Sequence, residues 1–133
     1  MHGRSDTNES LEQRQVQAAK KQSLFREMNE RIEELRPPST FIEFVCECTL
    51  EECSENVELT QQEYESVRSR SNRFAVSPGH VVPEVEVIVD HTDRYELVEK
   101  LGAGAFVAKR LDPRQQERRL NAVPSESVPN ESA

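Results

Sequence analysis

The chain has three cysteines, Cys46, Cys48 and Cys53, and all of them lie within eight residues. Zinc takes thiolate and imidazole ligands in a tetrahedron, and three cysteines with one histidine form one of its usual structural sites. The C-x-C pair supplies two sulfurs from one face of a strand, because side chains alternate along a strand. The sequence therefore predicts a structural Zn²⁺ site with Cys46, Cys48, Cys53 and His80 as ligands; His91 is the rival for the fourth position.

The same thiols fit two other interpretations. Cys48 and Cys53 could form a disulfide, which would make the chain a thiol-based redox sensor and leave Cys46 free. The nearby glutamates should raise the pKa of these thiols, and a helix N-terminus at Thr49 would oppose that effect. Alternatively, the cysteines are small buried apolar residues. Cysteines that only fill a core would be scattered along the chain, so their clustering favours metal binding over this last interpretation.

The residues between the cysteines carry a helix-start signal. Residues 49–52 read Thr-Leu-Glu-Glu, which fits a capping box with Thr49 at the N-cap and Glu52 at the third helical position. Cys48 and Cys53 then occupy the two positions that meet as a hydrophobic staple. The pattern predicts a helix that starts at Thr49. It also predicts that the three thiols converge without any help from metal.

Catalytic patterns are missing from this sequence. A nucleophilic cysteine needs a base and an orienting group, and the chain has too small a core to hold a substrate pocket as well. The segment Gly102-Ala103-Gly104 begins like the G-x-G-x-x-G motif of a dinucleotide-binding loop. It lacks the third glycine and the strand–helix context of that motif. We therefore expect a small binding or regulatory protein of unknown pathway and no enzyme.

The elements around the ligands indicate an α+β fold: a long N-terminal helix packed with a small, mainly antiparallel sheet and short helices. Residues 9–36 are expected to form the helix and residues 41–111 the module with the cysteine cluster. Residues 1–8 and 112–133 are expected to be disordered, since they lack the apolar residues that offset chain entropy. So small a module would gain from a metal or a partner.

The long helix carries one apolar stripe, formed by Leu11, Ala18, Leu24, Phe25, Met28, Ile32 and Leu35. Ser10 and Gln13 form a capping box at its start, and Pro37-Pro38 should end it. The stripe is expected to pack on the helix's own domain, because two clean heptads are few for a coiled coil. The alternative is a self-association scaffold, a homodimer through residues 22–35.

Alternation predicts the strands of the sheet. Residues 41–48 should form one, with Cys46 and Cys48 on its apolar face and Glu47 on the other. Val57 and Leu59 suggest a short strand before a helix capped by Thr60 that runs to about residue 70. Further strands are expected over 73–77 and 95–101, while 85–89 fits a strand or a helix. Pro78-Gly79 predicts a type II turn before His80. A turn at 102–104 should precede a short helix over 105–111.

The net charge is −8, and the negative charge is concentrated. Residues 41–66 contain eight glutamates and no lysine or arginine. Such a surface repels phosphate backbones, so nucleic acid is not expected as a partner; the run is expected to be a solvated face. The N-terminus has no signal-peptide pattern and no segment has the apolar length of a membrane span. We therefore expect a cytoplasmic protein with no membrane contact, whose partner would be an unknown protein.

Four stretches of the chain resemble a group of small acidic actinobacterial proteins that carry no assigned function. These stretches are residues 23–32, residues 44–48 with Cys53, residues 74–80 with their Pro-Gly-His, and residues 95–100. The resemblance covers most of residues 24–112. It implies a bacterial cytosolic protein with a single compact module, and it implies no activity.

Overall fold

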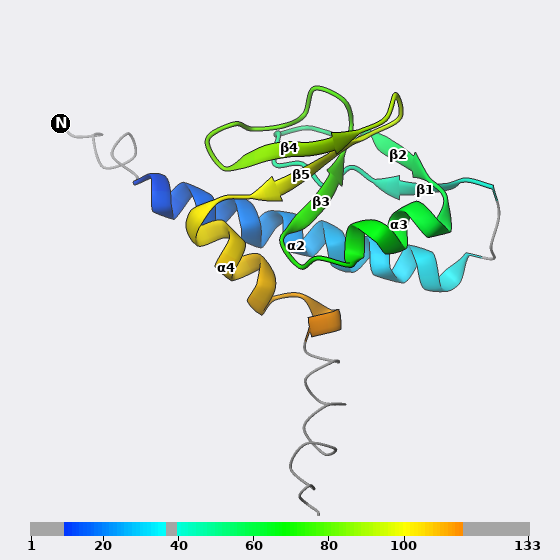
Figure 1. Cartoon of the computed structure of the whole chain (residues 1–133), viewed down its shortest axis with the longest axis horizontal. Coiled ribbons are helices and arrows are strands. Elements are labelled where there is room, and N and C mark those ends of the chain that lie inside the picture. Colours follow the sequence, from blue (N-terminus) through cyan, green and yellow to red (C-terminus); the bar gives the residue numbers. More distant parts are fainter. Residues whose placement is uncertain (1–9, 37–39, 116–133) are drawn as a thin grey trace, which may run out of the picture.

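The computed structural model describes residues 10–36 and 40–115. A long helix runs beneath two small antiparallel sheets, and two shorter helices lie against the long helix and the sheets (Figure 1). The expected α+β architecture is therefore confirmed. The expected disorder of residues 1–8 and of residues 116–133 falls outside the described residues, as does the Pro37-Pro38 helix stop.

Helix α2 spans Leu11–Leu35, and the predicted capping box at its start is present. The Ser10 hydroxyl accepts a hydrogen bond from the Gln13 backbone N–H at 3.1 Å, and the Gln13 side chain accepts one from the Ser10 N–H at 2.9 Å. The two bonds satisfy backbone donors that have no partner inside the helix.

The predicted packing of the apolar stripe of α2 is wrong in most positions. Leu11, Leu24, Met28 and Leu35 are 47%, 62%, 50% and 73% exposed, and of the clearly apolar members only Ile32 packs against the core cluster. The buried face is mainly polar: Gln15, Ala19, Gln22, Ser23, Arg26 and Asn29. These side chains face inward because each long polar side chain has a specific hydrogen-bond partner there. The spacing of apolar residues along the sequence cannot predict such partners.

Arg26 shows how this polar face contacts the rest of the fold. Its guanidinium donates to the Ser71 carbonyl at 2.7 Å and to the Ala108 carbonyl at 2.8 Å. It also lies over the ring of Phe74, 5.0 Å from the centroid. One buried cation thus ties α2 to the turn before strand β3 (Arg73–Val76) and to the last turns of helix α4 (Gly102–Arg110), where free carbonyls need donors.

Strands β1 (Ile42–Val45) and β2 (Asn56–Leu59) form an antiparallel pair in which Val45 faces Asn56. Strand β1 is shorter than expected, but the chain stays extended beyond it: the Cys46 N–H donates to the Glu55 carbonyl at 3.1 Å and the Glu47 N–H to the Ala75 carbonyl at 2.9 Å. Cys46 and Glu47 therefore bridge the two sheets.

The second sheet has the strand order β3-β5-β4, with all neighbours antiparallel. Its strands are β3 (Arg73–Val76), β4 (Glu86–His91) and β5 (Glu96–Lys100). The region that fitted either a strand or a helix is thus a strand, and a bulge lies between Ile88 and Asp90.

Helix α3 spans Gln61–Arg68 and begins at the predicted capping box of Thr60 and Glu63. Helix α4 spans Gly102–Arg110, so the predicted turn at Gly102-Ala103-Gly104 is wrong: these residues form the first helical turn. Glycine is needed there by packing, because a Cβ at Gly104 would lie 2.8 Å from the backbone oxygen of Gln15 in α2. A close helix crossing therefore explains a glycine that local reasoning assigned to a turn.

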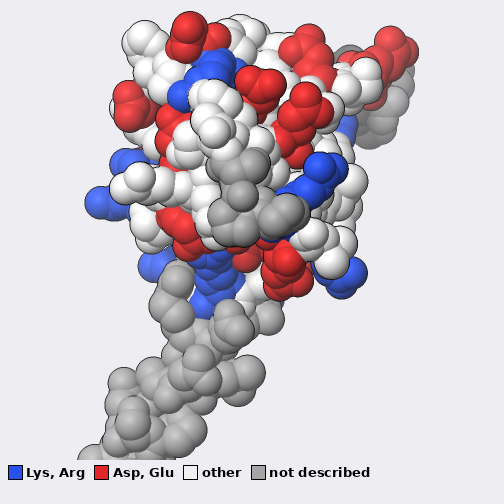
Figure 2. Space-filling model, turned by 90° about the vertical axis from the view of Figure 1, so that its right-hand side faces the viewer, with Lys and Arg blue, Asp and Glu red and all other residues white. Residues whose placement is uncertain are grey.

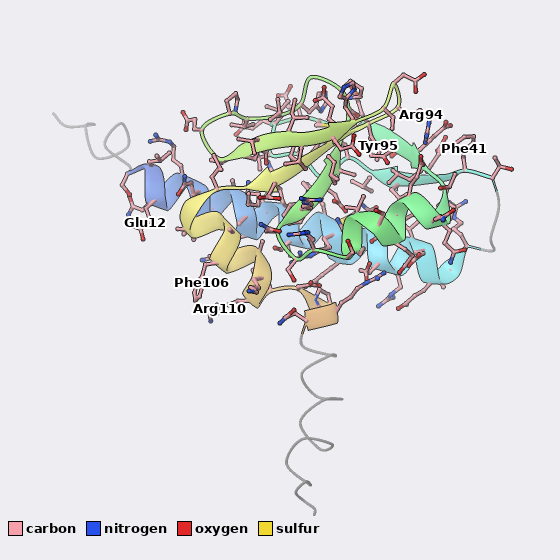
Figure 3. The ribbon with its side chains drawn as sticks, in the orientation of Figure 1. Glu12, Phe41, Arg94, Tyr95, Phe106 and Arg110 are labelled. Carbon is pink, nitrogen blue, oxygen red and sulfur yellow. The ribbon has the colours of Figure 1, made fainter. Side chains whose placement is uncertain are left out.

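The core lies between the sheets and the helices. Phe44 and Tyr64 stack with their ring centroids 4.3 Å apart, which joins β1 to α3. At one end of the molecule Arg94 lies over the ring of Phe41 and near Tyr95 (Figure 3), and its guanidinium pairs with Glu63 at 2.7 Å. This contact fixes the β4–β5 connection against the start of α3.

The acidic run of residues 41–66 is only partly the solvated face that we expected. Glu47 is buried, Glu63 pairs with Arg94, and Glu65 pairs with Arg114. At the right-hand end of the molecule as drawn in Figure 1, acidic and basic side chains are interspersed (Figure 2). Arginines from distant parts of the chain thus form ion pairs with some of these glutamates.

The described chain continues past residue 111, where the tail was expected to begin. Asp112 is buried and accepts a hydrogen bond from the Ser71 hydroxyl. Arg114 pairs with Glu30 at 2.8 Å, with Glu65 at 2.9 Å and with Glu33 at 3.3 Å. Residues 112–115 are therefore held against α2 and α3.

Candidate metal centre

Cys46, Cys48, Cys53 and His80 come together in one cluster. Each offers one ligand atom, and the four atoms all lie within 4.8 Å of one another. The Nδ1 atom of His80 is 3.5 Å from the Sγ of Cys46 and 3.6 Å from the Sγ of Cys53. His91, the rival ligand, is an exposed residue at the end of β4 and lies outside this cluster.

Two of these separations match those around a tetrahedral metal. With Zn–S near 2.3 Å and Zn–N near 2.0 Å, a sulfur and a nitrogen ligand of one tetrahedral zinc lie about 3.5 Å apart. The two measured sulfur–nitrogen distances are 3.5 and 3.6 Å. Three thiols and one imidazole are also the chemical set that such an ion requires, so the residues can hold a metal ion.

Glu47 positions the first two cysteines. It lies between them in the extended segment, and its side chain points to the opposite side, where both oxygens are bound. Oε1 accepts from Arg68 at 2.8 Å and from the Ala75 N–H at 3.0 Å; Oε2 accepts from Arg68 at 3.0 Å and from Asn29 at 2.7 Å. The alternation of side chains then turns Cys46 and Cys48 together toward the other side.

The prediction that Glu47 faces solvent is therefore wrong, although the shared face of the two cysteines is confirmed. Glu47 is 1% exposed. The strand pattern could not show this, because the residue that neutralises the carboxylate, Arg68, lies 21 positions away. A buried charge of this kind is tolerated only with a charge partner and hydrogen bonds.

Cys53 reaches the cluster by a tight turn, and the helix predicted from Thr49 is absent. Residues 51–52 form the turn, Glu52 has a φ of 64°, and the Cys53 N–H donates to the Leu50 carbonyl at 3.4 Å. The chain must reverse here because β2 pairs antiparallel with β1, and a helix would carry it away. The convergence of the thiols was predicted correctly, but its mechanism was not.

His80 follows the predicted Pro-Gly turn. Its backbone N–H donates to the Ser77 carbonyl at 3.0 Å, and Gly79 has a φ of 88°, as a type II turn requires at that position. Nδ1 faces the sulfurs, while Nε2 lies 3.6 Å from Oε2 of Glu55. A carboxylate on the far ring nitrogen is the usual means of orienting a histidine ligand. No local pattern in the sequence indicates this role for Glu55.

The environment favours neutral thiols when no cation is bound. Burial raises the pKa of Cys46 and of Cys48 above its usual value. Backbone donors oppose this: the Ser77 N–H lies 3.1 Å from the Sγ of Cys46, and the backbone of Leu50 lowers the pKa of Cys48. A bound cation would supply the remaining stabilisation of the thiolates. Three thiolates would carry three negative charges against the two positive charges of a divalent ion. Hydrogen-bond donors to sulfur would stabilise the excess negative charge.

Together, the fold and the site define an α+β protein with a Cys₃His group that could hold a metal ion. Comparison with models of protein families, with curated proteins and with solved structures finds no match. Among the described residues, none of the helices combines the length and the apolar composition that a membrane crossing needs.

Proposed function

We propose that this chain is a small zinc-binding protein in which Cys46, Cys48, Cys53 and His80 hold one structural Zn²⁺. The observation that carries the proposal is the convergence of four ligand atoms within 4.8 Å. Zinc is the proposed metal because soft thiolates and an imidazole in a tetrahedral arrangement favour it over harder cations.

The centre is proposed to stabilise the fold and to catalyse nothing. Four protein ligands fill a tetrahedron, whereas catalytic zinc keeps a position for water or substrate. The ligands come from three segments: the extended chain after β1, the residue after the 51–52 turn, and the turn after β3. A metal ion there would link the two sheets.

We propose a binding or regulatory role in the cytoplasm, where a reducing environment keeps thiols available for metal.

Native mass spectrometry and elemental analysis of the full chain, purified without added metal, test this proposal. We expect one zinc per chain. His80→Ala should lose most of the metal, and His91→Ala is the matched control that should keep it. Cobalt substitution adds a second readout, since thiolate coordination gives strong charge-transfer absorption. A metal-free wild-type chain that also fails to take up cobalt contradicts the proposal.

A thiol-based redox sensor is the second candidate, and the exposure of Cys53 favours it. Cys53 is partly exposed beside two buried thiols, so an oxidant can reach one sulfur of the cluster. A peroxide would take two electrons and two protons from Cys48 and Cys53, forming the disulfide and two waters. Mild peroxide should then lower the mass of the metal-free chain by two hydrogens. Raised thiol pKa values at Cys46 and Cys48 slow this reaction, which is why zinc is preferred.

A further inference from the structure

Helix α2 presents its apolar residues to solvent on the side opposite to its buried polar face. Leu24, Met28 and Leu35 are 62%, 50% and 73% exposed. At about 100° per residue the three lie within roughly 40° of one another around the helix axis. Gln22 and Arg26, both buried, lie about 160° away from Leu24 on either side of the opposite face. We name Leu24, Met28 and Leu35 the outer stripe.

The fold explains the polar side of α2 but not the outer stripe. The buried polar residues bind β1, the turn before β3 and α4. Among the described residues, the outer stripe belongs neither to the core cluster nor to the side chains packed against it, and each of its residues is at least half exposed. Three large apolar side chains in one row on a helix are the pattern of a helix–helix interface.

We propose that the outer stripe packs against the outer stripe of a second copy of this chain, with the two α2 helices antiparallel. Charge complementarity selects this occupant. The exposed charges beside the stripe are Lys20, Glu27, Arg31 and Glu34. In an antiparallel pair with Met28 near the two-fold axis, Lys20 of one copy comes within about two residues, roughly 3 Å along the axis, of Glu34 of the second copy.

The same arrangement brings Glu27 near Arg31 of the second copy, again offset by about two residues. Glu27 also approaches Glu27 of the second copy. Arg31 of each copy lies near these two carboxylates and offsets their repulsion. Arg31 is available for this contact, because its pairing with Glu34 in the same chain is long at 3.9 Å and both side chains are more than 70% exposed. An in-register parallel pair would leave Lys20 of one copy 14 residues, about 21 Å along the axis, from Glu34 of the second copy.

Light scattering after size-exclusion chromatography, and analytical ultracentrifugation, test the dimer with the full chain. We expect a concentration-dependent dimer that Leu24→Glu with Met28→Glu converts to a monomer. Leu11→Glu is the matched control: Leu11 is an exposed apolar residue of the same helix, about 140° from Leu24. Circular dichroism must show that every variant keeps its helix content.

Charge reversal tests the antiparallel arrangement and does not depend on apolar burial. Lys20→Glu alone and Glu34→Lys alone should each weaken dimerisation by about tenfold. The double variant should restore it, because the pair is then present with its signs exchanged. A wild-type chain that stays monomeric at several hundred micromolar overturns the proposal. So does a dimer that the outer-stripe variant leaves intact, or single reversals that the double variant fails to rescue.

Discussion

Glu47 and Arg68 form a buried, two-point ion pair directly behind the cysteine cluster. The guanidinium contacts the two carboxylate oxygens at 2.8 and 3.0 Å, and both side chains are 1% exposed. Asn29 and the Ala75 N–H fill the remaining acceptor positions. The residue between Cys46 and Cys48 is therefore the most heavily bonded carboxylate described in the structure.

Glu47→Gln should destabilise the fold strongly, because it leaves the Arg68 charge buried without its partner. Removing one member of such a pair costs about 3–5 kcal/mol. Urea unfolding followed by circular dichroism measures this free energy. Glu43→Gln is the control: it changes an exposed glutamate of β1, the strand that leads into Glu47, and should cost less than about 0.5 kcal/mol. Equal effects of the two substitutions would contradict the role of Glu47.

Glu55→Gln should weaken metal binding without weakening the metal-free fold. Glu55 is 61% exposed and contacts Nε2 of His80 at 3.6 Å, so its contribution is to orient the imidazole. Loss of such an orienting carboxylate lowers metal affinity by about tenfold or more. Competition with a chromophoric chelator measures the affinity. Glu52→Gln, an exposed glutamate of the same loop that lies outside the cluster, should leave the affinity unchanged.

Metal removal should lower the thermal stability of the chain. A ligand that binds only the folded state stabilises it by about 2.7 kcal/mol at 100 times its dissociation constant. For a domain of this size that corresponds to an increase in Tm of roughly 10–20 °C. Calorimetry with and without a zinc chelator should show the difference. It should disappear in His80→Ala and persist in His91→Ala; a chelator that leaves the wild-type Tm unchanged argues against a structural metal.

The acidic cluster that binds Arg114 should make stability depend on pH. Burial, together with the carboxylate of Glu65, raises the pKa of Glu33 from 4.5 to about 7. Its Oε2 atom is buried and has no hydrogen-bond partner among the described residues. Between these two values the folded chain holds a proton that the unfolded chain has released, so stability falls as pH rises through this window.

Glu33→Gln removes this dependence. When the pH is raised from 5 to 8, the free energy of unfolding of the variant should increase by about 1–2 kcal/mol relative to that of the wild type. The lowered pKa of Glu65, about 2, acts only below this window. Urea unfolding at both pH values measures the difference. Glu34→Gln, at an exposed position of the same helix, should show no such gain. A wild type and a Glu33→Gln variant that respond alike to pH would show that Glu33 is ionised throughout.

Local signals in the sequence were sufficient where a few neighbouring residues decide the structure. The capping boxes at Ser10 and Thr60 begin their helices as predicted, and Pro78-Gly79 forms the expected turn before His80. Similar reasoning failed at Thr49. There the same capping pattern forms a turn, because the pairing of β1 with β2 requires the chain to reverse.

The amino-acid sequence by itself determined which groups of this protein could hold a metal ion: three thiols and an imidazole. Tertiary structure decided what surrounds them. Whether Glu47 is buried depends on Arg68, 21 residues away. Which side of α2 faces inward depends on backbone carbonyls from three other segments: β1, the turn before β3 and α4. Alternation and periodicity describe only the nearest neighbours along the chain, whereas burial of a charge depends on a partner that the fold brings from elsewhere.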